Sequence, residues 1–245
     1  CFEDTNIVHV DGNINPKRDI ETINLELIFA DLETVNKKID SAKKKIKADK
    51  KFEAELNLYE KIKTALEAGK SARMLEYNEE ELEILKDAYL LTLKPILYIA
   101  NVSEAQLSNP FEDEKVKQVV EYAKEEKAEV IPLCVKIEEE LSSLEGDDKK
   151  EMLDALGLGE SGLDKVIKAS YSLLGLMSFL TAGEQEVRAW TIKKGTKAPE
   201  AAGKIHSDIE RGFIRAEVVS YDDLIREGSM VAAKEKGLVR SEGKD

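Results

Sequence analysis

The sequence of 245 residues predicts an α/β fold with a long helical arm and a smaller α/β domain at the C-terminus. Two short apolar runs, residues 95–100 and 128–134, flank a helical pattern at residues 112–127. Strand, helix and strand in this order are typical of a parallel sheet. An unbroken heptad stripe precedes them, and a run of alternating apolar residues follows them near the C-terminus.

These patterns divide the chain into four segments. Residues 1–15 and 91–180 are expected to belong to the sheet domain, which residues 16–90 interrupt as the helical arm. Residues 181–245 are expected to form the C-terminal domain, with strands at 187–192 and 213–219. Trp190 lies in the first of these strands and is expected in the core, although aromatic residues on such sheets can also stack on RNA bases.

The arm is predicted from one stripe of apolar residues with spacings of three and four. Its members are Leu25, Ile28, Leu32, Val35, Ile39, Ala42 and Ile46. This repeat is the pattern of a coiled-coil seam. A polar break at residues 48–50 and a second helical pattern at 52–66 predict an antiparallel hairpin. Asn78 and Glu81 have the spacing of a capping box, which predicts a further helix through Leu90.

Composition limits the classes of function. The net charge of −13 argues against a general nucleic-acid coat and against a DNA partner, while local basic patches stay possible. The two cysteines cannot form a disulfide framework, which fits a reducing compartment. No run approaches the ~20 apolar residues of a membrane span. We therefore expect a monomeric cytoplasmic protein that does not associate with membranes.

Lysines gather at the predicted tip of the arm. They are Lys43, Lys44, Lys45, Lys47, Lys50 and Lys51. On an acidic chain this cluster is a candidate contact for RNA or the ribosome, because phosphate attraction is local and depends on salt. The alternative is a solvated helix end, where the helix dipole favours lysine. The sequence leaves both interpretations open.

Polar turns follow both predicted strands of the sheet. The first turn covers residues 101–104 and the second covers residues 134–136. Because ligands of open parallel sheets bind beyond the carboxyl ends of the strands, we expect the two turns to form one site. The candidate binding residues are Asn101, Val102, Ser103, Glu104, Cys134, Val135 and Lys136. By itself Asn-x-x-Glu is also typical of a helix cap or a surface turn, and its place after a buried strand favours the site.

Segments along the whole chain resemble the YchF family of Obg-related ATPases. They include residues 1–4 (Cys-Phe-Glu-Asp), 19–27 (Asp-Ile-Glu-Thr-Ile-Asn-Leu-Glu-Leu), 98–104 (Tyr-Ile-Ala-Asn-Val-Ser-Glu) and 201–208 (Ala-Ala-Gly-Lys-Ile-His-Ser-Asp). The resemblance implies a P-loop NTPase (G domain) parallel sheet, an inserted antiparallel coiled-coil arm and a C-terminal β-grasp-like TGS domain. It also implies that ATP is preferred over GTP, that hydrolysis is slow, and that ribosomes are the partner.

Residues 101–104 look like an altered copy of the Asn-Lys-x-Asp motif with which GTPases read guanine. Residues 134–136 align with the Ser-Ala-Lys motif of the second loop, and only Lys136 is identical. The motif's Asp accepts hydrogen bonds from guanine N1 and N2, and adenine offers neither donor. Glu104 is longer than Asp, and Val102 replaces a Lys that packs along the base. Since unmatched polar groups cost about 1–3 kcal/mol, these changes predict a preference for adenine of about tenfold or more.

His9 is the candidate catalytic residue. It lies in a polar loop of the first segment. The chain resembles NTPases in which an apolar residue replaces the water-positioning Gln, and a histidine with a near-neutral pKa could take that role. The alternative is an ordinary loop histidine.

The chain departs from the family pattern in lacking the phosphate-binding motif. No Gly-x-x-x-x-Gly-Lys-Ser/Thr occurs in it, and we expect this loop, the switch regions and the Mg²⁺ ligands upstream of Cys1. The final strands of the TGS domain are expected after Asp245. We therefore expect a fragment that binds ATP weakly or not at all and does not hydrolyse it, with no metal ligand of its own. The alternatives are a non-catalytic module that binds RNA or the ribosome, and a helical adaptor that binds proteins.

Overall fold

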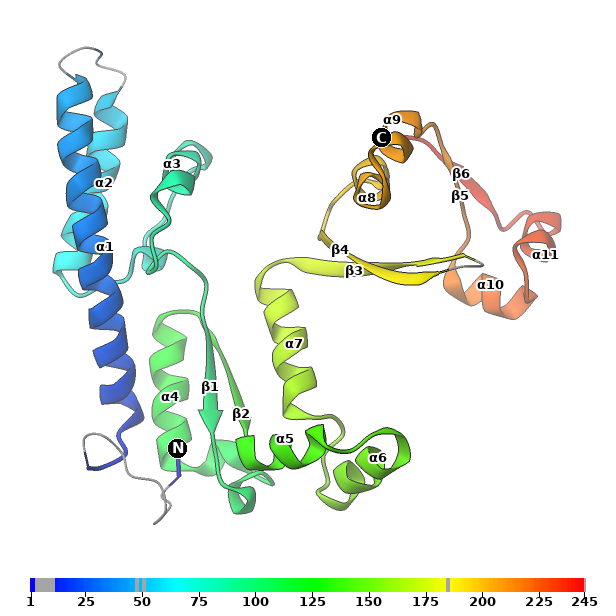
Figure 1. The fold of residues 1–245 in the computed structure, drawn as a ribbon, viewed down its shortest axis with the longest axis horizontal. Helices are drawn as coiled ribbons and strands as arrows, with labels where there is room; N and C mark the ends of the chain where they lie inside the picture. Colours follow the sequence, from blue (N-terminus) through cyan, green and yellow to red (C-terminus); the bar gives the residue numbers. More distant parts are fainter. Residues whose placement is uncertain (3–11, 47–48, 50–51, 184–185, 245) are drawn as a thin grey trace. The chain divides into compact units, whose positions relative to one another are not determined.

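The computed structural model describes residues 1–2, 12–46, 49, 52–183 and 186–244 (Figure 1). The chain divides into two compact units, Cys1–Leu173 and Leu174–Asp245. This division falls before the boundary expected at residue 180. The reason is that β3 (Leu176–Ala182) pairs along its whole length with β4 (Val187–Lys193), so both strands belong to the second unit.

The arm is a pair of helices, α1 (Pro16–Ile46) and α2 (Glu53–Glu67), that pack side by side and run in opposite directions (Figure 1). The seam buries apolar residues of both helices, among them Ile28, Val35, Ile39, Leu58, Tyr59, Ile62 and Leu66. The predicted stripe holds from Ile28 onward. Leu25 is 47% exposed, because this part of α1 lies alongside α4 (Glu114–Glu125) and not against α2.

The helix expected to run from Asn78 to Leu90 is shorter than predicted. The capping box is present: Glu81 N–H donates to Asn78 Oδ1 and Asn78 N–H donates to Glu81 Oε2, each at 2.8 Å. However, α3 spans only Glu79–Leu85, and the short 3₁₀ helix η3 (Lys86–Ala88) follows it. Tyr89 then takes a left-handed conformation with φ of 50°, which ends the helix.

The buried carboxylate of Asp31 binds the segment that follows η3 and Tyr89. Its oxygens accept the backbone N–H groups of Leu91 and Thr92 at 2.8 and 2.7 Å, and the Thr92 hydroxyl at 2.6 Å. These backbone donors therefore bind a side chain of α1 and do not continue the helix. The Thr92 hydroxyl oxygen also accepts Ala72 N–H at 3.2 Å, which attaches the 3₁₀ helix η2 (Ala72–Met74) to the same point.

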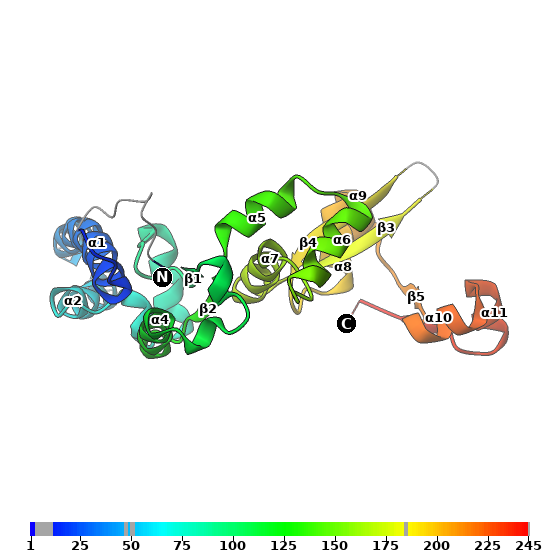
Figure 2. The same ribbon diagram turned by 90° about the horizontal axis from the view of Figure 1, so that it is seen from below.

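The sheet of the first unit confirms the predicted strand–helix–strand order. Strands β1 (Leu97–Asn101) and β2 (Glu129–Leu133) pair in parallel, with Asn101 opposite Leu133. Helices α4 and α7 (Gly162–Leu173) lie on opposite sides of the two strands (Figure 2). The apolar run at residues 95–100 suggested a buried strand, but Ile99 of β1 is 50% exposed. Within the described residues this sheet has only two strands, so part of its surface stays uncovered.

Two helices that the sequence did not predict, α5 (Val135–Ser142) and α6 (Gly146–Ala155), connect β2 to α7. The carboxylate of Glu138 on α5 accepts the N–H groups of Gly162 and Leu163 at 2.7 and 3.0 Å, and thereby caps α7. A Cβ atom at Gly162 would lie 2.8 Å from both Glu138 Oε1 and Leu133 Cβ. Glycine is therefore needed where α5, β2 and α7 meet.

The second unit is built on antiparallel pairs. Its remaining elements are α8 (Ala198–Ile205), α9 (Ser207–Gly212), β5 (Ala216–Val218), α10 (Tyr221–Glu227), α11 (Met230–Glu235) and β6 (Arg240–Glu242). Strand β5 pairs with β6. Trp190 is half-buried and not a core residue: its indole N–H donates to Thr181 Oγ1 at 2.9 Å, and the Arg188 guanidinium lies 4.2 Å from its ring centre. Across the described parts of the chain, no helix is long and apolar enough to cross a membrane.

Candidate functional site

The two segments predicted as turns meet at the carboxyl ends of β1 and β2, although the second is the start of α5, with Cys134 as its N-cap residue. Asn101 Oδ1 accepts the backbone N–H of Val135 at 3.1 Å, and Val102 N–H donates to the Leu133 carbonyl at 2.9 Å. A cavity of about 540 Å³ lies between the turns. Its lining residues are Phe2, Asn101, Val102, Ser103, Glu104, Ala105, Cys134, Val135, Lys136 and Glu139. Every binding residue expected from the sequence is among them.

These residues differ in depth. Val102 is fully buried in a cluster with Ala100 and Val116, and Cys134 is 5% exposed, so both belong to the buried part of the cavity wall. Glu104 and Lys136 are exposed at the rim. Within the described part of the chain, the Glu104 carboxylate has no hydrogen-bond or ion-pair partner, which leaves it available to a ligand.

The side chain of Gln106 supports the first turn. Its Oε1 accepts both the N–H and the hydroxyl of Ser103 at 2.8 Å. Its Nε2 donates to Asp113 Oδ2 at 2.6 Å. Asp113 in turn caps α4, because its Oδ1 accepts the N–H groups of Lys115 and Val116 at 2.9 and 3.1 Å. One side chain thus attaches the turn to the N-terminus of a helix.

Sequence reasoning missed Gln106, Asp113 and the aromatic lining residue Phe2. A local signal existed for the first: Ser103 and Gln106 have the spacing of a capping box, here opening the 3₁₀ helix η4 (Glu104–Gln106). Asp113 lies inside the helical pattern predicted at residues 112–127, but α4 begins only after it, and the 3₁₀ helix η5 (Pro110–Glu112) precedes it. Phe2 had no local signal, because it is distant in sequence from both turns.

The hydrogen bonds around Asp113 determine its charge. Burial alone would raise its pKa, but the bonds from Val116, Gln106 and Lys115 outweigh burial and lower the pKa below the ordinary value of 3.8. Asp113 is therefore ionised at neutral pH, which suits a carboxylate at the positive end of a helix.

The remaining candidates are His9 and the lysines at the tip of the arm. His9, Lys47, Lys50 and Lys51 lie outside the described residues. Lys43 pairs with Glu60 at 3.3 Å, and Lys45 pairs with Glu55 at 3.6 Å and lies 5.0 Å from the Phe52 ring centre. Lys44 is exposed. The positive charge of the described lysines is therefore partly neutralised by glutamates of α2. No group of three or more His, Cys, Asp or Glu side chains that could hold a metal ion occurs among the described residues.

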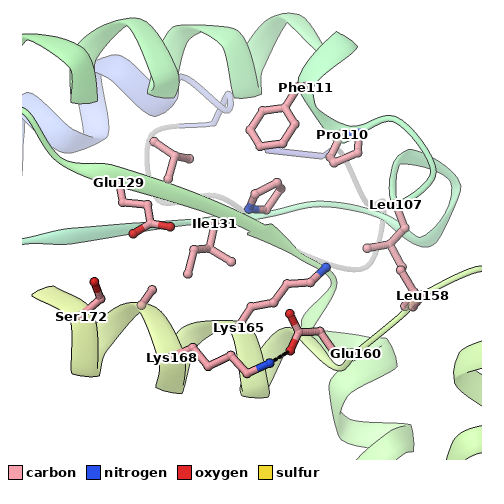
Figure 3. Close-up of a pocket in the computed structure, with 13 residues that line it drawn as sticks. Leu107, Pro110, Phe111, Glu129, Ile131, Leu158, Glu160, Lys165, Lys168 and Ser172 are labelled. Atoms are coloured by element: carbon pink, nitrogen blue, oxygen red, sulfur yellow. Dashed lines mark hydrogen bonds and ion pairs between the residues drawn. The ribbon is translucent and has the colours of Figure 1, made fainter. Parts of the chain in front are cut away.

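A second cavity, of about 610 Å³, lies between β2, α7 and the segment before α4 (Figure 3). Apolar residues such as Leu107, Phe111 and Ile131 line it, and Lys168 forms an ion pair with Glu160 at its wall. It lies beside β2 and not at the strand ends. Because ligands of parallel sheets bind beyond the carboxyl ends of strands, we assign the candidate site to the 540 Å³ cavity.

Comparison with known proteins shows the family to which the chain belongs. A family model for the C-terminal part of YchF GTPases, described as a protein of unknown function (DUF933), matches residues 176–245. The "Ribosome-binding ATPase YchF" of Bacillus subtilis is 57% identical over 246 residues, covering 100% of this chain and 67% of that protein. This chain belongs to the YchF family. The YchF protein of Escherichia coli O157:H7 is 46% identical over 247 residues, with the same coverage.

A solved YchF structure has the same fold. The chain matches the Schizosaccharomyces pombe YchF GTPase with a TM-score of 0.85 and 33% identity, covering 99% of this chain and 66% of that one. The predicted family and the α/β fold with a parallel sheet are therefore confirmed. The chain spans about two thirds of the length of these YchF proteins.

Replacing Asp113 by alanine tests the support of the first turn. We expect the unfolding free energy at pH 7 to fall by about 1–2 kcal/mol, because the variant loses the cap of α4. A lowered pKa means that the contribution is present above pH 3.8 and is lost as the pH falls through the native pKa below it. Urea unfolding from pH 7 to pH 3 should show a constant difference that narrows only below about pH 4.

Glu121→Ala, an exposed change on the same helix, is the control and should stay within about 0.5 kcal/mol of the unchanged protein. An Asp113→Ala difference that is absent at pH 7, or that widens in acid, would contradict the assigned role.

Proposed function

We propose that this chain supplies the base-binding site, the arm and the C-terminal domain of an ATP-preferring, ribosome-associated NTPase. The observation that carries this proposal is the junction of the two turns by the Asn101–Val135 hydrogen bond, beside a cavity of about 540 Å³. That volume lies within the usual range for small-molecule sites, about 300–1,000 Å³. The relatives described above carry the name ribosome-binding ATPase.

The hydrogen-bond inventory of the cavity favours adenine over guanine. Because Asn101 Oδ1 already accepts the Val135 N–H, the amide Nδ2 is the group left to donate to purine N7. The Val135 N–H is occupied for the same reason, so it is not available to the 6-oxygen of guanine. Adenine has an amino group at that position and does not need this donor. Phe2 offers an aromatic face on which a base can stack.

Glu104 also disfavours guanine. It stands where a guanine-reading motif has Asp, and its side chain is one methylene longer. Its exposed carboxylate at the rim would be displaced from the guanine N1 and N2 donors. Adenine lacks both donors, so it does not lose these two hydrogen bonds when the carboxylate is displaced.

The residues present fit a purine base and not a triphosphate. The chain contains no Gly-x-x-x-x-Gly-Lys-Ser/Thr loop to bind phosphates and Mg²⁺. We therefore expect residues 1–245 alone to bind nucleotide weakly and not to hydrolyse it. ATP, bound in a longer chain, would supply a phosphoanhydride bond for hydrolysis. His9 stays a proposed water-positioning residue for that step.

The arm and the second unit are the proposed partner-binding parts. We interpret the α1–α2 hairpin as a coiled coil and residues 181–245, with β3, as a TGS domain. Ribosomal RNA is the proposed ligand of the arm tip, where Lys44 is exposed and Lys43 and Lys45 would exchange their glutamate partners for phosphates. A ribosome-associated protein of this kind acts in the cytoplasm.

Nucleotide titration tests the base site. By calorimetry on the full-length protein, we expect ATP to bind more tightly than GTP. Asn101→Ala should weaken ATP binding by about tenfold or more, because it removes both the base contact and the link between the turns. Glu104→Asp should narrow the difference between ATP and GTP. Asn109→Ala, an exposed change outside the cavity, is the matched control and should leave the affinities unchanged. GTP binding more tightly than ATP would refute the adenine assignment.

Ribosome co-sedimentation tests the arm tip. Neutralising Lys43, Lys44, Lys45 and Lys47 with glutamine should weaken binding and make it less dependent on salt, since fewer counterions are released. Replacing four exposed lysines of the first unit outside the arm, Lys117, Lys124, Lys150 and Lys168, provides the charge-matched control. Binding that is equally strong in both variants and insensitive to salt would favour the helical-adaptor alternative.

A further inference from the structure

Hydrogen-bonded clusters lie at both ends of α4, one at the candidate base site and one at the root of the arm. We propose that α4 couples the two regions, with Gln106 and Glu126 as the positioning residues at its ends. The proposal rests on the base-binding function proposed above, and goes beyond it by assigning the residues through which a bound nucleotide would influence the arm.

The first cluster attaches the base-binding turn to α4. Ser103 donates twice to Gln106, and Gln106 donates to Asp113, the residue that caps the helix. Gln106 Nε2 also lies 3.5 Å from the carbonyl oxygen of Cys1, next to the lining residue Phe2. A ligand that orders this turn therefore acts on the N-terminal end of α4.

The second cluster surrounds Glu126, which ends α4. Its side chain is 4% exposed and that of Arg73 is 8% exposed. Arg73 Nη2 donates to both carboxylate oxygens of Glu126 at 3.1 and 3.2 Å. The Tyr98 hydroxyl donates to Glu126 Oε2 at 2.6 Å. Asn24 Nδ2 lies 3.4 Å from Glu126 Oε1 and 3.0 Å from the Tyr122 hydroxyl oxygen. Segments of α1, η2, β1 and α4 thus meet on one carboxylate.

Further hydrogen bonds join the segments of the arm root, which we define as residues 24–31 and 72–77. Arg73 donates to the Thr92 carbonyl at 3.2 Å and to Asn24 Oδ1 at 3.4 Å. Thr92 is bound to Asp31 of α1, which is 2% exposed. Because α1, η2 and the segment around Thr92 share these bonds, they must follow any displacement of Glu126 together.

The burial of the Arg73–Glu126 ion pair couples the position of the arm to that of α4. A buried ion pair adds little net stability, since desolvation offsets the attraction, but separating its partners leaves an uncompensated buried charge. A shift of α4 that leaves Arg73 behind is therefore unfavourable, and the arm moves with the helix. Helix α4 has 12 residues, so it spans about 18 Å as a rigid connection between the clusters.

Hydrogen–deuterium exchange on the full-length protein tests this coupling, with Mg²⁺ and a non-hydrolysable ATP analogue as the probe. We expect the analogue to slow exchange in residues 101–106 and also, by about fivefold or more, in the arm root, residues 24–31 and 72–77. Protection of the turn reports base binding, and protection of the arm root reports coupling, so the two hypotheses are measured separately.

Variants then interrupt the route at each end. Arg73→Met combined with Glu126→Leu replaces the ion pair by apolar groups and leaves no buried charge. It should keep the protection of residues 101–106 while reducing that of the arm root to less than about twofold. Lys124→Met with Glu125→Leu makes the same changes of charge and side-chain class at exposed neighbouring positions and should behave like the unchanged protein. If the first pair fails to fold, Tyr98→Phe removes one bond of the same cluster, and Gln106→Met interrupts the other end.

The outcomes separate the hypotheses. Protection of the turn without protection of the arm root would overturn the coupling and leave the base site standing. Arm-root protection that persists in the Arg73→Met/Glu126→Leu variant and in Gln106→Met would also overturn it. Absence of protection at residues 101–106 would contradict the proposed base site itself, and the coupling with it.

Discussion

The hydrogen bond from Val135 N–H to Asn101 Oδ1 is the interaction on which the candidate site depends, because it joins the ends of two parallel strands into one wall. Each turn also has its own supporting hydrogen bonds outside the cavity. Gln106 and Asp113 tie the first turn to α4, and Glu138, one turn into α5, caps α7 behind the second. The fully buried Val102 packs beneath the wall. A small cavity with a defined hydrogen-bond pattern results from these supports.

The parts that the sequence predicted correctly are those with local signals. The apolar runs and the helical period between them predict β1, α4 and β2, and the strand-end rule then brings residues 101–104 and 134–136 together. The Asn78–Glu81 capping box was also predictable from a local signal, since both partners lie within one helical turn. The family resemblance extended these patterns to the whole chain, and the relatives confirm it.

The parts that could not be predicted depend on distant residues. Beyond η3 and the left-handed Tyr89, Asp31 of α1 accepts the N–H groups of Leu91 and Thr92, and nothing near these residues in the sequence reveals that distant partner. Leu25 fits the heptad stripe but is exposed, because this part of α1 lies alongside α4 and not against α2. Phe2 joins the cavity from the far end of the chain. Local periodicity does not encode which surfaces meet.

We propose that an adenine base binds against the wall made by Asn101 and Val135. The most direct measurement is a crystal structure of the full-length protein with Mg²⁺ and an ATP analogue. We expect the adenine ring in the cavity beside Phe2, with Asn101 Oδ1 still accepting the Val135 N–H and Nδ2 facing N7. A base bound elsewhere, or an Asn101 side chain turned away from Val135 in the complex, would contradict it.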